Sequence, residues 1–295
     1  MPLWQGQRMD VISLQSRVKT GYVGNAVAVP TLAWAGVTPH PVDSVTFPHH
    51  PGHGPVTPQV TPTDALANAL AATMDACADP AYVLSGYLAN AAQGRALLDF
   101  ITDARASGRI SAWYLDPVFG DDPEGTYVDA ALVDFFREAA LPACTCVLPN
   151  RYELGILSGA RVDTVEDAVA AARILISLGP ETVLASSVPA AGGSLANVLV
   201  TAQAAWGISV PKRPLRAKGT GDMLSAAFTG LRARGYPAVA AAQSAVAAVD
   251  AAVRDASDRD LVELDPNKTL ISLNFKRKDP AESTYTELLE QQPPK

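Results

Sequence analysis

The sequence predicts an α/β fold of three layers, in which a mostly parallel central sheet is flanked by helices and a small flap covers one site. Short apolar runs alternate with longer helical patterns along the chain, which is typical of parallel βαβ units. No linker or internal repeat interrupts this alternation. With 48% hydrophobic and 18% charged residues, the 295-residue chain can bury a large core. We therefore expect residues 1–295 to form a single domain whose ends, 1–9 and 276–295, are loosely ordered.

The expected strands are short apolar runs that are mostly closed by polar turns. They lie at residues 10–14, 37–47, 81–84, 111–115, 144–148, 182–185, 197–201, 205–210 and, as an edge strand, 270–275. The expected helices lie at 25–35, 63–76, 91–106, 128–138 and 164–178, followed by one that begins after Gly219 and by the alanine-rich run 237–253. Thr63 is expected to cap the second of these helices, and Thr164 with Asp167 resembles a capping box.

Two irregular segments interrupt this pattern. Residues 48–55 are too rich in proline, glycine and histidine for regular structure, which predicts a mobile flap. A metal site at the histidines of this segment is the less favoured alternative, because no cysteine or carboxylate lies nearby in the sequence. Gly192 and Gly193 are expected to form a hairpin turn between two strands.

Charge and composition exclude several classes of partner. The formal net charge of −7 offers no basic surface for nucleic acid. The most apolar long stretch, 237–253, is mostly alanine and contains polar residues, so it predicts a core helix and not a membrane span. Three cysteines form an odd set with no signal-peptide pattern before them, which predicts a reduced, cytoplasmic protein. Small molecules are the expected partners.

The segment Lys218-Gly219-Thr220-Gly221-Asp222 carries the main chemical signal. It leads into an apolar, alanine-rich helix, and backbone amides at a helix start favour a phosphate. A transferring phosphate could bind the amides of Gly219, Thr220 and Gly221, with Asp222 as the general base beside it. Ordinary helix capping selects similar residues, so this segment alone leaves both interpretations open.

Polar side chains also follow several of the expected strands. In a doubly wound sheet such positions converge on one edge and form a single cleft. The residues concerned are Ser16, Tyr87, Asp116, Asp121, Glu153, Ser186 and Asp222. Two of them, Asp116 and Asp121, could hold Mg²⁺ directly or through water, although aspartates are also common in plain turns. The convergence favours a kinase site.

Motifs of the commoner nucleotide-binding classes are absent from the sequence. It contains no Gly-x-x-x-x-Gly-Lys-Ser/Thr, no His-Arg-Asp or Asp-Phe-Gly set, and no Gly-x-Gly-x-x-Gly. The chain is therefore not expected to be a P-loop enzyme, a protein kinase or a Rossmann dehydrogenase.

Five segments, taken in order, resemble pyridoxal kinases of the ribokinase-like superfamily. They are Gln15-Ser16-x-Val18-x-x-Gly21-x-x-Gly24-Asn25, Leu84-Ser85-Gly86-Tyr87-Leu88, Asp116-Pro117-Val118-x-Gly120-Asp121, Pro149-Asn150-x-x-Glu153 and Gly219-Thr220-Gly221-Asp222. The resemblance covers residues 11–234 and continues more weakly to 275. The last segment alone is typical of the superfamily, whereas the set in this order is typical of pyridoxal kinases.

The resemblance implies ATP-dependent phosphorylation of the 5'-hydroxymethyl group of pyridoxal, and of pyridoxine or pyridoxamine as possible further substrates. It implies that Asp222 is the base, with Gly219, Thr220 and Gly221 as the anion hole. The substrate-binding residues implied are Ser16, Tyr87, His50 and Asp222. Those implied for ATP are Asp116, Asp121, Tyr127, Asn150, Glu153, Ser186, Ser187 and Thr220. Asp116, Asp121 and Glu153 are implied to arrange Mg²⁺ beside a monovalent cation, K⁺ or Na⁺, and the family's habit implies a homodimer.

The chain departs from the family pattern at three places. Pro51 replaces a threonine of the flap two residues after Pro48-His49, Leu148 replaces a common threonine, and Lys218 precedes the glycine loop where an apolar residue is usual. The first and last changes bear on pyridoxal and phosphate binding. Alternatives to the main hypothesis are a related kinase for hydroxymethylpyrimidine or a sugar, and a vitamer-binding protein without catalysis.

Overall fold

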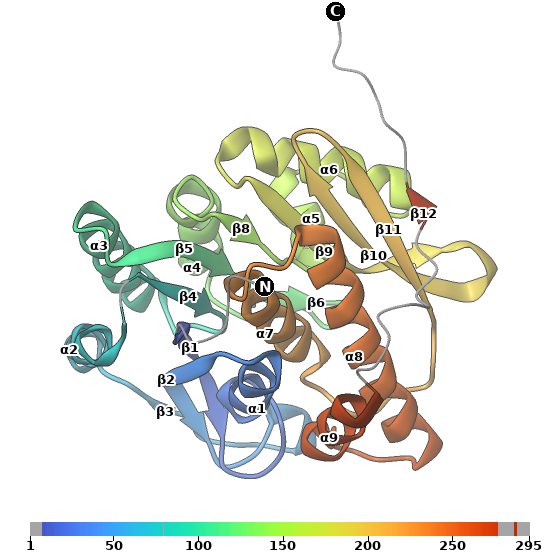
Figure 1. The fold of residues 1–295 in the computed structure, drawn as a ribbon, viewed down its shortest axis with the longest axis horizontal. Coiled ribbons are helices and arrows are strands. Elements are labelled where there is room, and N and C mark those ends of the chain that lie inside the picture. Colours follow the sequence, from blue (N-terminus) through green and yellow to red (C-terminus); the bar gives the residue numbers. More distant parts are fainter. Residues whose placement is uncertain (1–7, 79, 277–285, 288–295) are drawn as a thin grey trace, which may run out of the picture.

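The computed structural model describes residues 8–78, 80–276 and 286–287. Within them, one ten-stranded sheet runs in the order β12-β11-β10-β9-β8-β5-β4-β1-β2-β3 (Figure 1). Its strands are β1 (Asp10–Val18), β2 (Thr38–Phe47), β3 (Gln59–Val60), β4 (Ala81–Ser85), β5 (Ile110–Leu115), β8 (Cys146–Val147), β9 (Thr182–Ala190), β10 (Ser194–Thr201), β11 (Ala205–Pro211) and β12 (Thr286–Glu287). A separate hairpin pairs β6 (Gly120–Asp121) with β7 (Gly125–Thr126).

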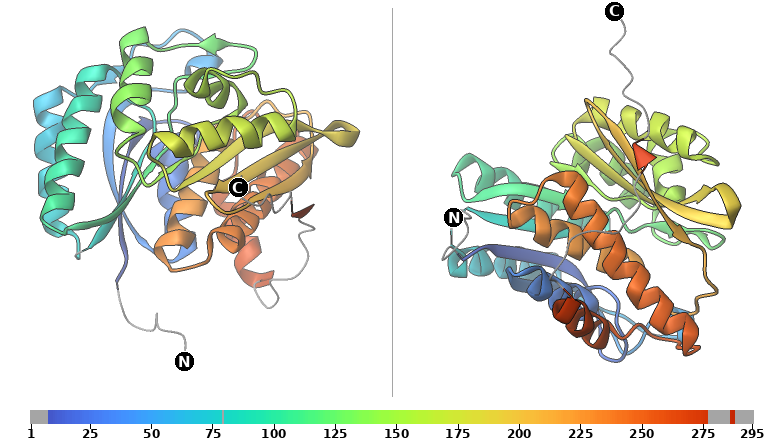
Figure 2. Two further views of the ribbon diagram at one scale, coloured as in Figure 1. Left: turned by 90° about the horizontal axis from the view of Figure 1, so that it is seen from above. Right: turned by 45° about the vertical axis from the view of Figure 1, so that its right-hand side comes forward.

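Helices cover both faces of this sheet, as Figure 2 shows. They are α1 (Asn25–Ala35), α2 (Thr63–Ala76), α3 (Ala91–Ala106), α4 (Ala130–Phe135), α5 (Arg151–Ser158), α6 (Val165–Leu178), α7 (Thr220–Ala233), α8 (Ala238–Asp258) and α9 (Pro266–Lys276). The predicted fold class, a mostly parallel sheet between helical layers, is therefore confirmed.

The order of the strands reverses direction at β1. Strands β2, β1, β4, β5, β8 and β9 are parallel, whereas β3 and β10 to β12 pair antiparallel at the two sides. The chain leaves β1 for β2 on one side and later returns to β4 on the other side of β1. At such a reversal the carboxyl ends of neighbouring strands border an open space, which is where α/β folds bind ligands.

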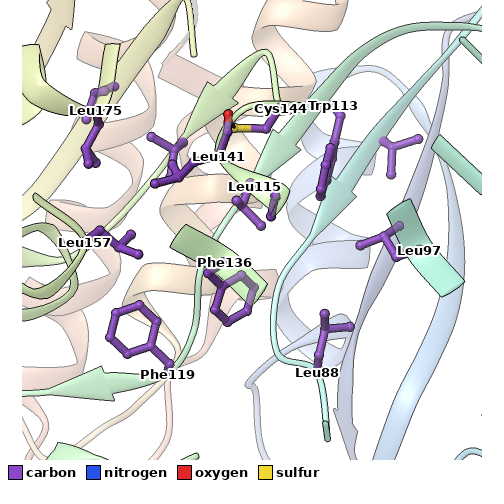
Figure 3. Close-up of a cluster of buried hydrophobic side chains, with 14 of the residues drawn as sticks. Leu88, Leu97, Trp113, Leu115, Phe119, Phe136, Leu141, Cys144, Leu157 and Leu175 are labelled. Atoms are coloured by element: carbon purple, nitrogen blue, oxygen red, sulfur yellow. Dashed lines mark hydrogen bonds between the residues drawn. The ribbon is translucent and has the colours of Figure 1, made fainter. Parts of the chain in front are cut away.

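Two large hydrophobic cores lie on opposite faces of the sheet. One packs α2 to α6 against it around Trp113, Phe119 and Phe136, which are fully buried (Figure 3). The other packs α1, α7 and α8 around residues such as Leu32 and Phe228. A smaller third cluster joins α1, α7, α8 and α9, and it consists of Val27, Ala217, Met223, Ala248, Ala252, Ala256, Leu264 and Leu270.

Local signals at several element ends behave as predicted. Thr164 and Asp167 form a reciprocal capping box at the start of α6. Gly192 and Gly193, with φ of 68° and 71°, turn the hairpin between β9 and β10. Thr63 does not cap α2, because Pro62 occupies the cap position and has no side-chain acceptor for the first amides. The ring of Pro62 fixes its φ, here −55°, and the chain enters the helix without a polar cap.

The predicted edge strand at 270–275 is wrong, because these residues belong to α9. Asp265 precedes this helix and accepts a hydrogen bond from the backbone of Lys268, and Pro266 is the first helical residue. Both are start signals of a helix, and they outweigh the strand propensity of a short apolar run. Burial of Leu270 against the third cluster completes the helix.

Smaller differences concern boundaries. The expected helix 128–138 is α4 continued by a π-helical turn, Phe136–Ala140, and the expected strand 144–148 shortens to β8. In the described part of the chain, no helix is long and apolar enough to cross a membrane. The termini expected to be loose fall mostly outside the described residues. Arg8, which is described, forms an ion pair of 2.8 Å with Asp10.

Candidate active site

The two glycines at the start of α7 have different surroundings. Gly219, the residue before the helix, has φ of 94°, and a side chain there would collide with the carbonyl oxygen of Tyr22. A Cβ on Gly221 would meet nothing within 4 Å among the described residues. The first amides of a helix have no partner within it, so the amides of this turn face open space. The sequence predicts an anion hole at this turn, and the space beside Gly221 is open.

Asp222 stands in the first turn of α7. Its carboxylate oxygen Oδ2 accepts a hydrogen bond of 2.9 Å from the backbone amide of Gly24, which lies just before α1. Burial raises the pKa of Asp222, and the Gly24 amide offsets part of that rise. A side chain on Gly24 would collide with Ser16, so only glycine brings its amide this close. The residue proposed as a base is thus fixed by a turn that lies almost two hundred residues earlier.

The predicted site residues line up along the carboxyl edge of the parallel strands. Backbone hydrogen bonds connect successive strand ends there, from Gly86 to Leu14, from Asp116 to Ser85 and from Leu148 to Leu115. The row ends where Ser186 donates to Pro149 at 2.9 Å. Because each strand ends next to its neighbour, the polar residues that follow the strands share one crevice. The structure therefore places the residues that follow these strands along one edge of the sheet.

Three carboxyl groups interact inside this crevice. Burial raises the pKa of Asp116 to about 8, and the neighbouring Asp222 adds to the rise. Burial and the charge of Asp116 likewise raise the pKa of Glu153. Groups of like charge in a poorly solvated place disfavour one another's ionised forms. The cluster is therefore suited to a ligand that brings positive charge.

Glu153 is held by backbone amides at both of its oxygens. Oε2 accepts from Asn150 at 2.9 Å, in a capping box at the start of α5, and Oε1 accepts from Phe119 at 3.0 Å and Gly120 at 3.4 Å. The Asn150 side chain in turn donates to the carbonyl of Gly120 at 2.7 Å. These bonds join α5 to the β6–β7 hairpin. Glu153 therefore stabilises the hairpin, a role that its sequence position did not indicate.

The predicted trio of metal ligands does not form a ready metal site. In the described ranges, no group of three or more histidine, cysteine, aspartate or glutamate side chains is placed to hold a metal ion. Asp116 and Glu153 lie in one buried cluster, whereas Asp121 sits half-buried in β6 and accepts from the Asp122 amide at 2.8 Å. Any metal here needs oxygen ligands from a substrate as well.

The β6–β7 hairpin forms one wall of the crevice. Burial and the carboxyl groups of Glu153 and Asp222 raise the pKa of Tyr127, which places its phenol at the acid cluster although the residue is half exposed. Lys218 reaches across from the glycine loop, with Nζ 3.3 Å from Oε1 of Glu124 in the hairpin. This ion pair joins the glycine loop to the hairpin, although about half of each side chain is exposed.

The residues predicted to bind the substrate lie at or just beyond the ends of β1, β2 and β4. Ser16 is buried beside Gly24, and the Tyr87 ring meets Phe47 edge-on, with centroids 6.2 Å apart. His50 is in the flap, before a 3₁₀ turn at Pro51–His53, and burial together with the charge of Lys218 lowers its pKa. A neutral imidazole is expected there at neutral pH. Pro51 opens the 3₁₀ turn, so the residue that replaces the family's threonine shapes the flap.

Ser186 and Ser187 lie at a bulge in β9. Ser186 forms a parallel bridge with Asn150, and Ser187 has φ of 61°, a rare conformation for a residue with a side chain. Opposite them, the register with β10 shifts between Ala196 and Val198. Strained backbone of this kind is often found at binding sites. The bulge exposes Ser187 at the same edge as Asn150.

Several residues of the site escaped the sequence analysis. Gly24 stood in a quoted motif but received no role, and its spacing from Gly21 was the only signal. Glu124, Tyr22 and Glu263 gave no local signal, since their contacts join segments far apart in the chain.

Comparison with known proteins identifies the family of the chain. The family model for phosphomethylpyrimidine kinase matches residues 56–262. Pyridoxal kinase PdxY of Leifsonia xyli subsp. xyli is 31% identical over 252 residues, which are 82% of this chain and 87% of that protein. Pyridoxal kinase PdxY of Rubrobacter xylanophilus is 34% identical over 235 residues, which are 77% and 80% of the two chains.

Solved structures give the same fold. The structure of pyridoxal kinase from Leishmania donovani in complex with ADP and pyridoxine superimposes with a TM-score of 0.81 at 24% identity, covering 90% of this chain and 95% of that one. At this identity the likeness supports the ribokinase-like fold and no more. The curated relatives carry the assignment further, because they exceed 30% identity over most of both chains. On these grounds the chain belongs to the pyridoxal kinase family.

Proposed function

We propose that this chain transfers the γ-phosphoryl group of ATP to the 5'-hydroxymethyl group of pyridoxal, and of pyridoxine and pyridoxamine as related vitamers. The carrying observation is the pairing of Asp222 with the Gly24 amide at 2.9 Å, beside glycines that open the start of α7. Family membership supports the same reaction, and a structural neighbour from Leishmania donovani holds ADP and pyridoxine.

In the proposed reaction the substrate hydroxyl attacks the γ-phosphorus, the bond from that phosphorus to the bridging oxygen breaks, and ADP leaves. Asp222 takes the hydroxyl proton. Its raised pKa brings the carboxylate nearer to the working pH, which improves it as a proton acceptor. The amides of Gly219, Thr220 and Gly221 donate to the oxygens of the moving phosphoryl group, where negative charge must be stabilised.

The nucleotide and its cations are assigned to the wall formed by β6, β7 and β9. Asn150, Ser186, Ser187, Thr220 and Tyr127 are proposed to contact ATP. Asp116, Asp121 and Glu153 would help to hold Mg²⁺ on the phosphates, directly or through water, and Glu153 also fixes the hairpin through its backbone hydrogen bonds. Mg²⁺ would neutralise phosphate charge, and K⁺ or Na⁺ would bind nearby. The buried, mutually repelling carboxyl groups favour such cations.

A second candidate substrate is hydroxymethylpyrimidine, because the matching family model describes phosphomethylpyrimidine kinases. The two compounds present a hydroxymethyl group on a flat heteroaromatic ring, and the Tyr87 and Phe47 rings could pack beside either.

A substrate panel tests the proposal. Purified protein is incubated with ATP, Mg²⁺ and K⁺ and with pyridoxal, pyridoxine, pyridoxamine, hydroxymethylpyrimidine or ribose, and product phosphate esters are measured. Turnover led by pyridoxal is expected. Faster turnover of hydroxymethylpyrimidine or ribose would assign that compound as the substrate instead of pyridoxal. Binding of pyridoxal without turnover would support a non-catalytic vitamer-binding protein.

We also propose that the protein is a cytoplasmic homodimer. Its three cysteines are free thiols in the structure, which suits a reducing compartment. Sedimentation of the purified protein measures the oligomeric state.

A further inference from the structure

The turn between α8 and α9 meets two segments of the proposed substrate site. Glu263 in this turn pairs through Oε1 with Nε2 of His53 in the flap, at 2.8 Å. Its other oxygen, Oε2, accepts a hydrogen bond of 3.2 Å from the backbone amide of Tyr22. Tyr22 lies in the segment between Ser16 and Gly24, here called the substrate turn (residues 19–24). One carboxylate therefore holds the flap and the substrate turn together.

The Tyr22 peptide is also packed against the anion hole. Its carbonyl oxygen lies so close to Gly219 that any side chain at 219 would collide with it. Two residues later, the Gly24 amide donates to Asp222. A shift of the substrate turn would therefore move one wall of the anion hole and the hydrogen bond that orients Asp222.

Glu263 is held in place by its neighbours along the chain. Leu264 is 1% exposed and belongs to the third cluster, together with Val27 of α1 and Met223 of α7. Leu261 packs against the same cluster from the other side of Glu263. The cluster joins the α8–α9 turn to α1 and α7, whose first turns border the proposed site. The backbone that carries Glu263 is therefore held in place by packing.

We propose that Glu263 is a positioning residue that clamps the flap to the substrate turn and so fixes the Gly24 amide and the anion hole. Glu263 is not among the residues that the sequence predicts for the site. The kinetic consequences of the clamp rest on the proposed kinase reaction, whereas its structural consequences do not.

The structural test is hydrogen exchange of the ligand-free protein. Glu263→Ala is expected to raise amide exchange about tenfold in both residues 20–24 and residues 49–54, because both lose their anchor. His53→Ala is expected to raise exchange in the flap alone. Lys268→Ala, which breaks the ion pair of 2.9 Å with Asp255 near the same turn but touches neither segment, is the matched control and should leave both unchanged.

The kinetic test uses the same variants with ATP and pyridoxal. Glu263→Ala is expected to raise KM for pyridoxal and lower kcat, each about three- to tenfold, and Glu263→Gln, which keeps an acceptor for the Tyr22 amide, should recover most of kcat. If Glu263→Ala proves unstable, His53→Ala and Glu263→Gln decide the question.

Unchanged exchange in both segments of folded Glu263→Ala would overturn the clamp, whatever the activity. Equal kinetic losses in Glu263→Gln and Glu263→Ala would overturn its role as an acceptor. Wild-type protein that exchanges as expected but phosphorylates none of the panel would refute the proposed function and leave the clamp standing.

Discussion

Individual glycines decide how closely the backbone can approach a phosphate. Gly219 and Gly221 stand two residues apart, yet their surroundings differ. The first has a positive φ and is pressed against Tyr22, whereas the second has helical neighbours and open space around it. Substitution by alanine at the two positions therefore distinguishes an effect on stability from an effect on phosphate binding.

Gly221→Ala is predicted to preserve or slightly raise stability, because alanine favours a helix by up to about 1 kcal/mol over glycine. Its methyl group would occupy the space assigned to the phosphoryl group, so kcat/KM should fall about a hundredfold. Gly219→Ala should instead lower the free energy of unfolding by about 2 kcal/mol or more. Thermal unfolding and steady-state kinetics measure both, and an active Gly221→Ala enzyme would contradict the assigned position.

Asp116 links the chemistry of the site to stability. Its pKa is raised from its ordinary value to about 8, so between about pH 4 and pH 8 the folded state binds more protons than the unfolded state. Stability must then fall as pH rises through that window. Asp116→Asn, which cannot ionise, is predicted to raise the melting temperature by at least about 2 °C at pH 8 and by less at pH 5.

Melting curves of ligand-free wild type and Asp116→Asn across pH 5–8 measure this effect. An equal difference between the two proteins at every pH would show that Asp116 is not the group concerned. The same variant should lose activity if Asp116 helps to hold the nucleotide's cation.

At the scale of elements, the burial pattern of α9 shows why its short apolar run forms a helix and not the predicted strand. Leu270 is buried, Ile271 is 58% exposed, Ser272 is exposed and Leu273 is again half-buried. This three-residue spacing is helical, since a strand would return every second residue to the core. The third cluster supplies the surface that α9 covers.

Leu270→Ala is predicted to lower the free energy of unfolding by about 2–3 kcal/mol, because it leaves a cavity in the third cluster. Ile271→Ala, on the exposed face, should change it by less than about 0.5 kcal/mol. Chemical denaturation measures both free energies. Similar losses of stability at the two positions would contradict the described orientation of α9.

Elements with strong local signals were predicted from the sequence, and those defined by distant contacts were not. Helices α1, α2 and α3 begin and end where their periodicity predicts, and Thr164 with Asp167 caps α6 as expected. The five quoted motifs placed Asp222 and its companions at one edge of the sheet. The position of Glu153 after a strand was recognised, but its bonds to Phe119 and Gly120 were not, because they depend on the hairpin folding back and no local pattern encodes that.

At the scale of the whole molecule, the crevice is closed by contacts between remote segments. Lys218 and Glu124 are separated by 94 positions and join the glycine loop to the β6–β7 hairpin. About half of each side chain is exposed to solvent, so their ion pair contributes at most about 1 kcal/mol to stability. The position of the lysine beside the proposed phosphate site matters more than the pair itself.

Lys218→Met is therefore predicted to raise KM for ATP about tenfold with little change in melting temperature, through loss of positive charge near the phosphates. Glu124→Gln removes the partner but keeps the lysine, and it should leave KM for ATP within about threefold. Initial rates at varied ATP measure this, and matching effects of the two variants would assign the effect to the ion pair instead.

The central claim is that Asp222 takes a proton from the substrate hydroxyl while the start of α7 holds the phosphoryl group. The most direct measurement compares wild type and Asp222→Asn, using single-turnover phosphorylation of pyridoxal and equilibrium binding of pyridoxal to each protein. We predict that the variant binds pyridoxal within about fivefold of wild type while phosphoryl transfer slows by about three orders of magnitude. Wild-type rates in Asp222→Asn would contradict the account and place the base elsewhere.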